Sequence, residues 1–337
     1  MTIQDAIKKL ISGEHLTKTE ARDVMNSIMS GETTDAQIAA YLTALRIKGE
    51  TVEEISGSAE SMASNAEHFN INPEGVVDTC GTGGDNLHTF NISTTAAFIS
   101  AGAGVKIAKH GNRSVSSKCG SADILKNFGV NIDINIEKYV QVFNKIGIAF
   151  LFAPLFHKAM KYAIGPRREL GVRTVFNVLG PLTNPARVKR QVIGVFDKEL
   201  CNTIANVLKE LGSEHVMVVH GADGLDEISI TGDTFVSELK NGIVKDYKIH
   251  PDNFGIKCHP LKEIQSPDCD MNKKMIEDIL NKKDGAPLDT AVLNAAASIV
   301  VSGKADNLLD GVEIAYESVM QGKAKSKLEQ LIEYTNR

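Results

Sequence analysis

The segment from Asp78 to Thr95 constrains the fold of this chain more than any other stretch. It reads DTCGTGGDNLHTFNISTT and lies between an apolar pair, Val76-Val77, and the apolar run of a predicted helix. The order is therefore strand, glycine-rich turn and helix. Its three glycines, Gly81, Gly83 and Gly84, allow positive φ and close approach to a ligand, so that several N–H groups can face one concavity that binds anions. The hydroxyl-rich end of the segment adds neutral donors at a helix N-terminus, which also favours an anion.

This loop matches neither of the common phosphate-binding patterns. GxGxxG requires a third glycine where Asn86 stands, and no lysine follows as in GxxxxGK[ST]. Asp85 inside the loop would repel phosphate, so we expect it to meet a sugar hydroxyl, a substrate amine or a metal ion. From the loop alone, an ordinary strand-to-helix turn stays open as the alternative.

Composition narrows the class of protein. With 337 residues and 42% hydrophobic residues, the chain suits one large domain or two unequal ones. A net charge of −5, 5% aromatic residues and no basic block argue against nucleic acid as a partner. There is no apolar run near the roughly 20 residues that span a bilayer and no signal-peptide pattern. Five cysteines without a CxxC pair suggest free thiols in a reducing compartment, so we expect a cytoplasmic protein without membrane contact.

The hydrophobic pattern predicts two kinds of structure. The first seventy residues read as four short helices, with capping boxes at Thr17, Thr34 and Thr51 and helix-ending glycines at 13, 31 and 49. From about residue 75, strands alternate with helices, which indicates a mostly parallel sheet with helices on both faces. The predicted strands are 76–77, 105–108, 148–151, 191–195 and 215–219, with an antiparallel edge at 234–239 and 243–249. The predicted helices are 92–102, 121–128, 137–146, 198–211, 271–281, 288–302, 306–321 and 323–334.

These elements predict an α/β fold in which a small all-helical domain packs on a larger α/β domain with a central, mostly parallel sheet. Residues 155–187 interrupt the alternation: 155–162 reads as a helix that Gly165-Pro166 then breaks. We expect residues 1–70, with about 155–187, to form the small helical domain and hinge. Residues 71–154 and 188–337 would form the α/β domain, with its ligand outside the carboxyl ends of the strands.

Two further loops follow predicted strands. Lys109 to Asp123 carries Lys109, Arg113 and Lys118 among serines and glycines, which suits a second anion site. The loop after residue 219 carries the adjacent acids Asp226 and Glu227, and paired acids near phosphate loops favour Mg²⁺. Each loop alone could be solvated surface, but together they describe a site for a multiply phosphorylated ligand with a metal ion.

The ordered motifs resemble the anthranilate phosphoribosyltransferase family. They are GTGGD at 81–85, NxST at 91–94, KHGNR at 109–113, GSAD at 120–123, GPLTNP at 180–185 and GLDE at 224–227. The resemblance runs the length of the chain and implies a fold like that of nucleoside phosphorylases and phosphoribosyltransferases, usually as a homodimer. It implies transfer of the phosphoribosyl group of 5-phosphoribosyl 1-pyrophosphate to the amine of anthranilate, with release of pyrophosphate, in tryptophan biosynthesis.

The resemblance also implies the site residues. Those for phosphoribosyl pyrophosphate are Gly81, Gly84, Asp85, Thr89, Asn91, Ile92, Ser93, Thr94, Lys109, His110, Gly111, Asn112, Arg113, Ser114, Val115, Ser116, Ser117 and Ser121. Those for anthranilate are Gly81, Asn112 and Arg167, and those for Mg²⁺ are Ser93, Asp226 and Glu227. It assigns no dedicated acid or base; His110 could act as a base or position a substrate. A pyrimidine nucleoside phosphorylase, similar in fold but independent of Mg²⁺, and a non-catalytic paralogue that binds a phospholigand or nucleic acid are the alternatives.

Overall fold

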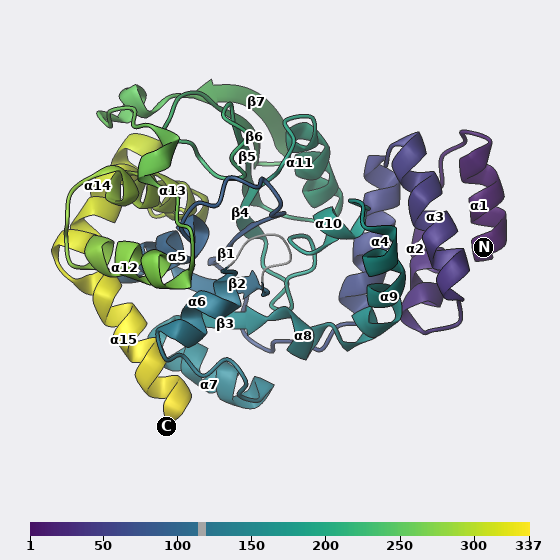
Figure 1. The fold of residues 1–337 in the computed structure, drawn as a ribbon, viewed down its shortest axis with the longest axis horizontal. Coiled ribbons are helices and arrows are strands. Elements are labelled where there is room, and N and C mark those ends of the chain that lie inside the picture. The colour runs from purple at the N-terminus through teal and green to yellow at the C-terminus, as the bar shows by residue number, and fades with distance from the viewer. Residues whose placement is uncertain (114–118) are drawn as a thin grey trace.

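A helical unit and a larger α/β unit lie at opposite ends of the long axis of the computed structural model, which describes residues 1–113 and 119–337 (Figure 1). The predicted site residues Ser114, Val115, Ser116 and Ser117, and Lys118 of the same predicted anion loop, therefore lie outside the described residues. The helical unit consists of α1 (Ile3–Ile11), α2 (Lys18–Met29), α3 (Asp35–Lys48) and α4 (Val52–Ser64).

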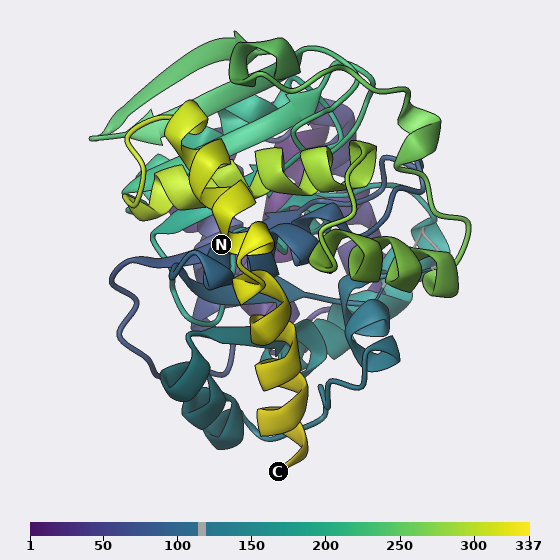
Figure 2. The ribbon, with the colours of Figure 1, turned by 90° about the vertical axis from the view of Figure 1, so that its left-hand side faces the viewer.

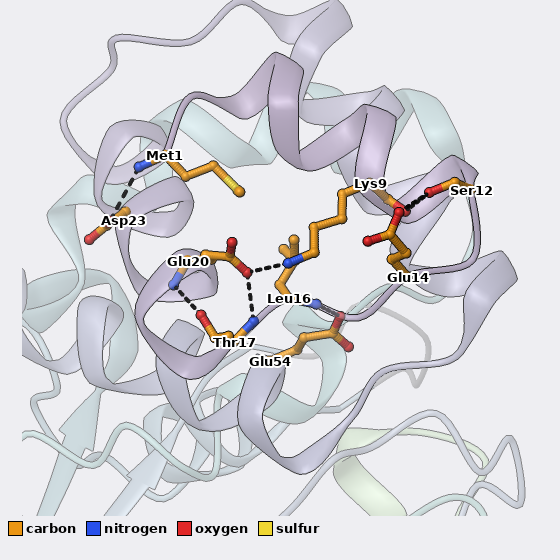
Figure 3. A network of polar contacts seen from close by, with 9 residues as sticks. All are labelled: Met1, Lys9, Ser12, Glu14, Leu16, Thr17, Glu20, Asp23 and Glu54. Carbon is orange, nitrogen blue, oxygen red and sulfur yellow. Dashed lines mark hydrogen bonds and ion pairs between the residues drawn. The ribbon is translucent and has the colours of Figure 1, made fainter.

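A threonine side chain caps the start of each of these four helices, and three of the caps are capping boxes. The capping boxes predicted at Thr17, Thr34 and Thr51 are all present. Figure 3 shows the box at Thr17 within the network of the unit: the Glu20 carboxylate accepts a hydrogen bond from the Thr17 N–H and forms an ion pair with Lys9 of α1, both at 2.8 Å. The buried carboxylate of Glu54 accepts the Leu16 N–H at 2.9 Å, which ties the α1–α2 connection to α4.

The α/β unit is built on one seven-stranded sheet in the order β3-β2-β1-β4-β5-β6-β7. The strands β1 (Val76–Gly81), β2 (Lys106–Gly111), β3 (Ile148–Phe152), β4 (Arg190–Gly194) and β5 (His215–Gly221) are parallel. The strands β6 (Thr234–Lys240) and β7 (Ile243–Ile249) form the predicted antiparallel edge. Because five strands run the same way, the loops after β1, β2 and β5 gather at one edge of the sheet.

Helices cover both faces of the sheet, as predicted. One layer contains α5 (Ile92–Gly102) and α13 (Ala286–Ser302), backed by α14 (Leu308–Met320) and α15 (Lys323–Asn336), as Figure 2 shows. The other face packs on α11 (Leu200–Glu210), which also contacts α4. A single apolar cluster extends from Val24 and Leu42 of the helical unit to Ile193 and Val218 of the sheet. The helical unit therefore hides its apolar face against the α/β unit.

The remaining helices frame this core. They are α6 (Ser121–Asn127), α7 (Ile136–Ile146), α8 (Ala153–Phe156), α9 (Lys161–Leu170), α10 (Phe176–Leu179) and α12 (Cys269–Leu280), with 3₁₀ turns at Lys158–Met160, Pro251–Phe254 and Leu261–Glu263. In the part of the chain that the structure describes, no helix combines the length and apolarity needed to cross a membrane.

Three expectations from the sequence are wrong. The single helix predicted at 155–162 is absent, because the backbone leaves helical geometry at His157 (φ −103°, ψ 58°), so that α8 ends at Phe156 and a 3₁₀ turn follows before α9. Gly165-Pro166 does not break a helix, because α9 continues through both residues. Pro166 is buried, and the packing of α9 against α3 offsets the single hydrogen bond that its missing N–H removes. The expectation of five free thiols fails as well: Cys119 and Cys269, 150 positions apart, form a disulfide. Cys80, Cys201 and Cys258 are free.

Candidate active site

The glycine-rich loop after β1 depends on left-handed backbone. Gly83 and Gly84 have φ of 65° and 83°, and Asn86 and His88 also have positive φ, at 59° and 55°. Four such residues within six positions turn the chain sharply, and the Gly83 N–H donates to Asp226 Oδ2 at 2.7 Å. The Asp85 carboxylate accepts the Leu87 N–H at 3.1 Å within the loop. The turn therefore lies directly on the acidic loop after β5.

The predicted metal ligands converge although they come from different parts of the chain. Glu227 Oε1 accepts the Ser93 N–H at 3.1 Å, across 134 positions of sequence. Desolvation, followed by the charges of Asp85 and Glu227, raises the pKa of Asp226 well above its usual range. Desolvation also raises the pKa of Glu227 to about 7, against the opposing charge of Lys109. The two carboxylates lie close together beside the Ser93 hydroxyl, and a cation would favour their charged forms. These groups provide only oxygen donors, which is the donor set that fits Mg²⁺.

Lys109 lies beside this acidic pair. Its ammonium donates to the Thr79 carbonyl and to Ser93 Oγ, the latter at 3.1 Å, and the side chain is buried. Burial lowers the pKa of Lys109, and the charge of Asp78 opposes that shift. Asp78 is itself buried and accepts hydrogen bonds from the His110 N–H at 3.0 Å and the Asn184 amide at 2.8 Å. Lys109 thus places its amino group beside the acidic pair and Ser93.

The start of α5 contributes the next group of predicted residues. Asn91 is the N-cap residue of α5, and Ser93 and Thr94 follow in its first turn. Among the described residues, the buried Thr94 hydroxyl has no hydrogen-bond partner. Ile92 is buried in the core and can offer only its backbone to a ligand. Thr89 forms an isolated bridge with Gln265, which anchors the end of the glycine-rich loop.

The second predicted anion loop begins where β2 ends. Gly111 allows close packing, because a Cβ there would lie 2.5 Å from Ser121 Oγ. The carbonyl of Asn112 accepts hydrogen bonds from Ser121 Oγ and the Ala122 N–H, at 3.1 and 3.2 Å. These bonds close the two described ends of the loop. Asn112 and Arg113 are exposed, and Arg113 lies over the Phe152 ring at 5.9 Å.

Arg167 on α9 and His110 near the end of β2 are the remaining predicted site residues. Arg167, on α9, is half-buried over the Phe176 ring at 5.1 Å, whereas Arg168 is exposed. His110 Nδ1 lies 3.2 Å from the Gly180 carbonyl, and burial lowers the pKa of His110 to about 3. A neutral ring that donates through Nδ1 leaves Nε2 as an acceptor, which has no partner among the described residues. The ring of His157, another buried histidine, lies 5.1 Å away.

Comparisons with known proteins place this site in a family. Residues 4–66 match the family model "Glycosyl transferase family, helical bundle domain", and residues 73–325 match "Glycosyl transferase family, a/b domain". An anthranilate phosphoribosyltransferase of Alkaliphilus metalliredigens is 51% identical, over 98% of this chain and 97% of the relative. One of Thermoanaerobacter sp. is 50% identical, over 99% of both chains. The chain belongs to the anthranilate phosphoribosyltransferase family.

Solved structures of the family have the same fold. The anthranilate phosphoribosyltransferase of Thermus thermophilus superposes with a TM-score of 0.94 at 38% identity, covering 99% of this chain and 100% of that one. That of Saccharomyces cerevisiae in complex with PRPP and Mg superposes with a TM-score of 0.90 at 29% identity, covering 99% and 98%. A second structure of the yeast enzyme, in complex with 4-fluoroanthranilate, has a TM-score of 0.89 at 29% identity, covering 99% and 97%.

The sequence patterns did not predict several residues that shape the site. A Cβ on Gly194, at the end of β4, would lie 1.5 Å from the Asp226 carbonyl, so only glycine fits there. Arg173 donates to the Gly84 carbonyl and lies over the Phe196 ring at 4.0 Å. A glycine at the carboxyl end of a predicted parallel strand was a usable signal for Gly194. No local pattern marks Arg173, because its partners are far away in the sequence.

Proposed function

We propose that this protein transfers the phosphoribosyl group of 5-phosphoribosyl 1-pyrophosphate to the amine of anthranilate. The products are N-(5-phosphoribosyl)anthranilate and pyrophosphate, and the step belongs to tryptophan biosynthesis. The observation that carries the proposal is the convergence of Asp226, Glu227, Ser93 and Lys109 on the glycine-rich loop. It is supported by relatives near 50% identity over almost the whole chain.

The proposed binding roles follow the chemistry of each position. The glycine-rich loop and the start of α5, from Gly81 to Thr94, offer N–H groups and hydroxyls to pyrophosphate and ribose. Residues 109–117 and Ser121 would bind a second phosphate of the same substrate. Gly81, Asn112 and Arg167 would hold anthranilate, with the guanidinium on the carboxylate, because that group can bind carboxylates bidentately.

The residues fit Mg²⁺ at Asp226, Glu227 and Ser93. When bound there, Mg²⁺ would supply positive charge to the leaving pyrophosphate. Lys109 and N–H groups of the glycine-rich loop would add to the stabilisation of the same developing negative charge. Burial, which lowers the pKa of His110 to about 3, argues against His110 as a general base and favours a role in positioning the acceptor. The aromatic amine of anthranilate needs no strong base, so holding it at C1 is the main task of the site.

A direct assay tests the proposal. Anthranilate is fluorescent and the chain has no tryptophan, so loss of anthranilate fluorescence can be followed with phosphoribosyl pyrophosphate and Mg²⁺. We expect the loss to require all three components. Phosphorolysis of pyrimidine nucleosides without Mg²⁺, in place of that reaction, would establish the phosphorylase instead. Binding of phosphoribosyl pyrophosphate without turnover would establish the non-catalytic paralogue.

The acidic pair gives a sharper test of the metal site. We expect Asp226→Asn combined with Glu227→Gln to lose most turnover, since each charge-assisted contact is worth about 1.5–3 kcal/mol. The melting temperature of the metal-free variant should not fall, because two crowded acids are neutralised. Full Mg²⁺-dependent activity of the variant would contradict the assignment.

We also propose a cytoplasmic homodimer without nucleic-acid or membrane partners. The proposal of a homodimer rests on the resemblance to the family, and the exposed apolar side chains of Ile11 (74%) and Ile47 (82%) on the helical unit are ones that a second copy could cover. Light scattering should give twice the monomer mass.

The number of free thiols tests the proposed compartment. Titration of denatured protein prepared without reductant should give five thiols if a reducing cytoplasm keeps Cys119 and Cys269 reduced, and three if their disulfide persists.

A further inference from the structure

Asn272 of α12 is a buried residue that holds the start of α5. Its side chain is 2% exposed. Its Oδ1 accepts the Asn91 N–H at 3.1 Å, and its Nδ2 donates to Asn91 Oδ1 at 2.7 Å. Asn91 Nδ2 in turn donates to the Cys119 carbonyl at 3.3 Å. Asn91 is therefore held in one orientation, two residues before Ser93.

Asn294 of α13 holds a different loop in the same way. It is also 2% exposed. Its Oδ1 accepts the Ile228 N–H and its Nδ2 donates to the Ile228 carbonyl, both at 2.9 Å. Ile228 is buried and follows Glu227 directly in the sequence. Asn294 therefore fixes the backbone from which the acidic pair projects.

Both asparagines use donor and acceptor together. A buried amide that both donates to and accepts from one residue restrains that residue, as the two hydrogen bonds between paired residues of antiparallel strands do. Removing such an amide leaves buried polar groups without partners, which costs more than the bond itself contributes. The two helices act on loops that follow different strands, β1 for Asn272 and β5 for Asn294. Their main effects should therefore differ, although the Ser93 N–H, two residues after Asn91, donates to Glu227 and joins the two loops.

We propose that Asn272 and Asn294 are positioning residues for two separate parts of the active site. Asn272 orients Asn91 for phosphoribosyl pyrophosphate, and Asn294 orients Asp226 and Glu227 for Mg²⁺. The proposal rests on the proposed function of those loops.

The test compares Asn272→Ala and Asn294→Ala with the wild-type protein. For Asn272→Ala we expect the KM for phosphoribosyl pyrophosphate to rise about tenfold, while the Mg²⁺ concentration for half-maximal rate stays within about twofold. For Asn294→Ala we expect the reverse, about a tenfold rise in the Mg²⁺ requirement. The KM for anthranilate should change in neither. Calorimetric titration with phosphoribosyl pyrophosphate and with Mg²⁺ should give the same split without turnover.

Ser318→Ala is the matched control for the loss of a buried hydrogen bond. Ser318, on α14, is 2% exposed and donates to the Ile99 carbonyl at 2.7 Å, toward the far end of α5. This variant should lose stability without a change in either substrate parameter. If an alanine variant does not fold, Asn272→Leu or Asn294→Leu replaces it, because leucine keeps the volume and the helix.

Two results would overturn the proposal. One is equal change in both parameters for both variants, and the other is lowered melting temperature with both parameters at wild-type values. In either case the asparagines support only the fold. Wild-type protein without Mg²⁺-dependent use of anthranilate would instead refute the proposed function, so the two failures can be told apart.

Discussion

At the scale of single residues, the site is built around two acids, Asp226 and Glu227, whose ionised forms are disfavoured unless a proton or a cation neutralises them. Asp226 and Glu227 share a crowded space with Asp85, and desolvation raises the pKa of both acids of the pair. The charge of Lys109 opposes part of the rise in the pKa of Glu227. The metal-free protein therefore holds protons that Mg²⁺ must displace. Mg²⁺ binding should consequently depend on pH in a predictable direction.

We predict that Mg²⁺ binds more tightly as pH rises from 6 to 8. Glu227 has its pKa raised to about 7 from an ordinary value of 4.5, so the folded protein binds more protons than the unfolded chain between these values. The stability that this group adds to the metal-free protein is present below pH 4.5 and is lost as pH rises through about 7. Added Mg²⁺ should consequently raise the melting temperature more at pH 8 than at pH 6. An equal rise at both pH values, or the same pH dependence in Asp226→Asn/Glu227→Gln, would argue against this coupling.

We predict that Arg167, and not Arg168, selects the acceptor. Arg167 is half-buried and held over Phe176, whereas the neighbouring arginine is exposed. Arg167→Ala should weaken anthranilate use by roughly 2 kcal/mol, about thirtyfold in KM, and leave phosphoribosyl pyrophosphate almost unaffected. Steady-state kinetics of both alanine variants decides the matter. Loss of anthranilate use in Arg168→Ala alone would show that the other arginine carries the role.

At the scale of elements, strand ends bring together residues that are far apart in the chain. The end of β4 passes so close to the loop after β5 that a side chain at Gly194 would meet the Asp226 carbonyl. The end of β1 contacts the same loop through the Gly83 N–H. The order of the strands in the sheet thus brings the end of β4 and the loops after β1 and β5 together in one site.

We predict that Gly194→Ala damages the metal site more than the fold. The added methyl must displace the Asp226 backbone, and overpacking of this kind costs roughly 1–3 kcal/mol. Because the displaced residue is a proposed metal ligand, the Mg²⁺ requirement should rise as well. Gly232→Ala is the control, since a Cβ there meets nothing within 4 Å. Thermal unfolding and Mg²⁺ titration of both variants measure the two effects, and wild-type behaviour of Gly194→Ala would contradict the prediction.

Sequence reasoning worked where the signal was local. Alternating strands and helices predicted the sheet and its antiparallel edge, and the threonine capping boxes predicted where α2, α3 and α4 begin. It failed where tertiary packing decides, as at Pro166 inside α9 and at the Cys119–Cys269 disulfide. The motifs indicated the acids and the glycine-rich loop. They could not reveal Arg173, Asn272 or Asn294, whose roles depend on partners far away in the sequence.

At the scale of the whole molecule, the proposed ligand groups lie on two units. The loops for phosphoribosyl pyrophosphate belong to the α/β unit, whereas Arg167 lies on α9, which packs against α3 of the helical unit. Arg173, which follows α9, already reaches the Gly84 carbonyl. A ligand held by both units would favour a state in which they lie closer together, as in hinge closure around other ligands.

We predict that this closure needs both substrates. Phosphoribosyl pyrophosphate with Mg²⁺ should engage the α/β unit alone, because its proposed partners all lie there. Benzoate has the carboxylate and ring of anthranilate but no amine, so it can occupy the acceptor position without turnover. Adding it should reduce the radius of gyration measured by small-angle X-ray scattering. Arg167→Ala, which lacks the cation for that carboxylate, should show no such reduction at the same concentration. Identical scattering curves for the free and doubly loaded wild-type protein would mean that the two units keep their arrangement, and that Arg167 reaches its substrate without any movement of the hinge.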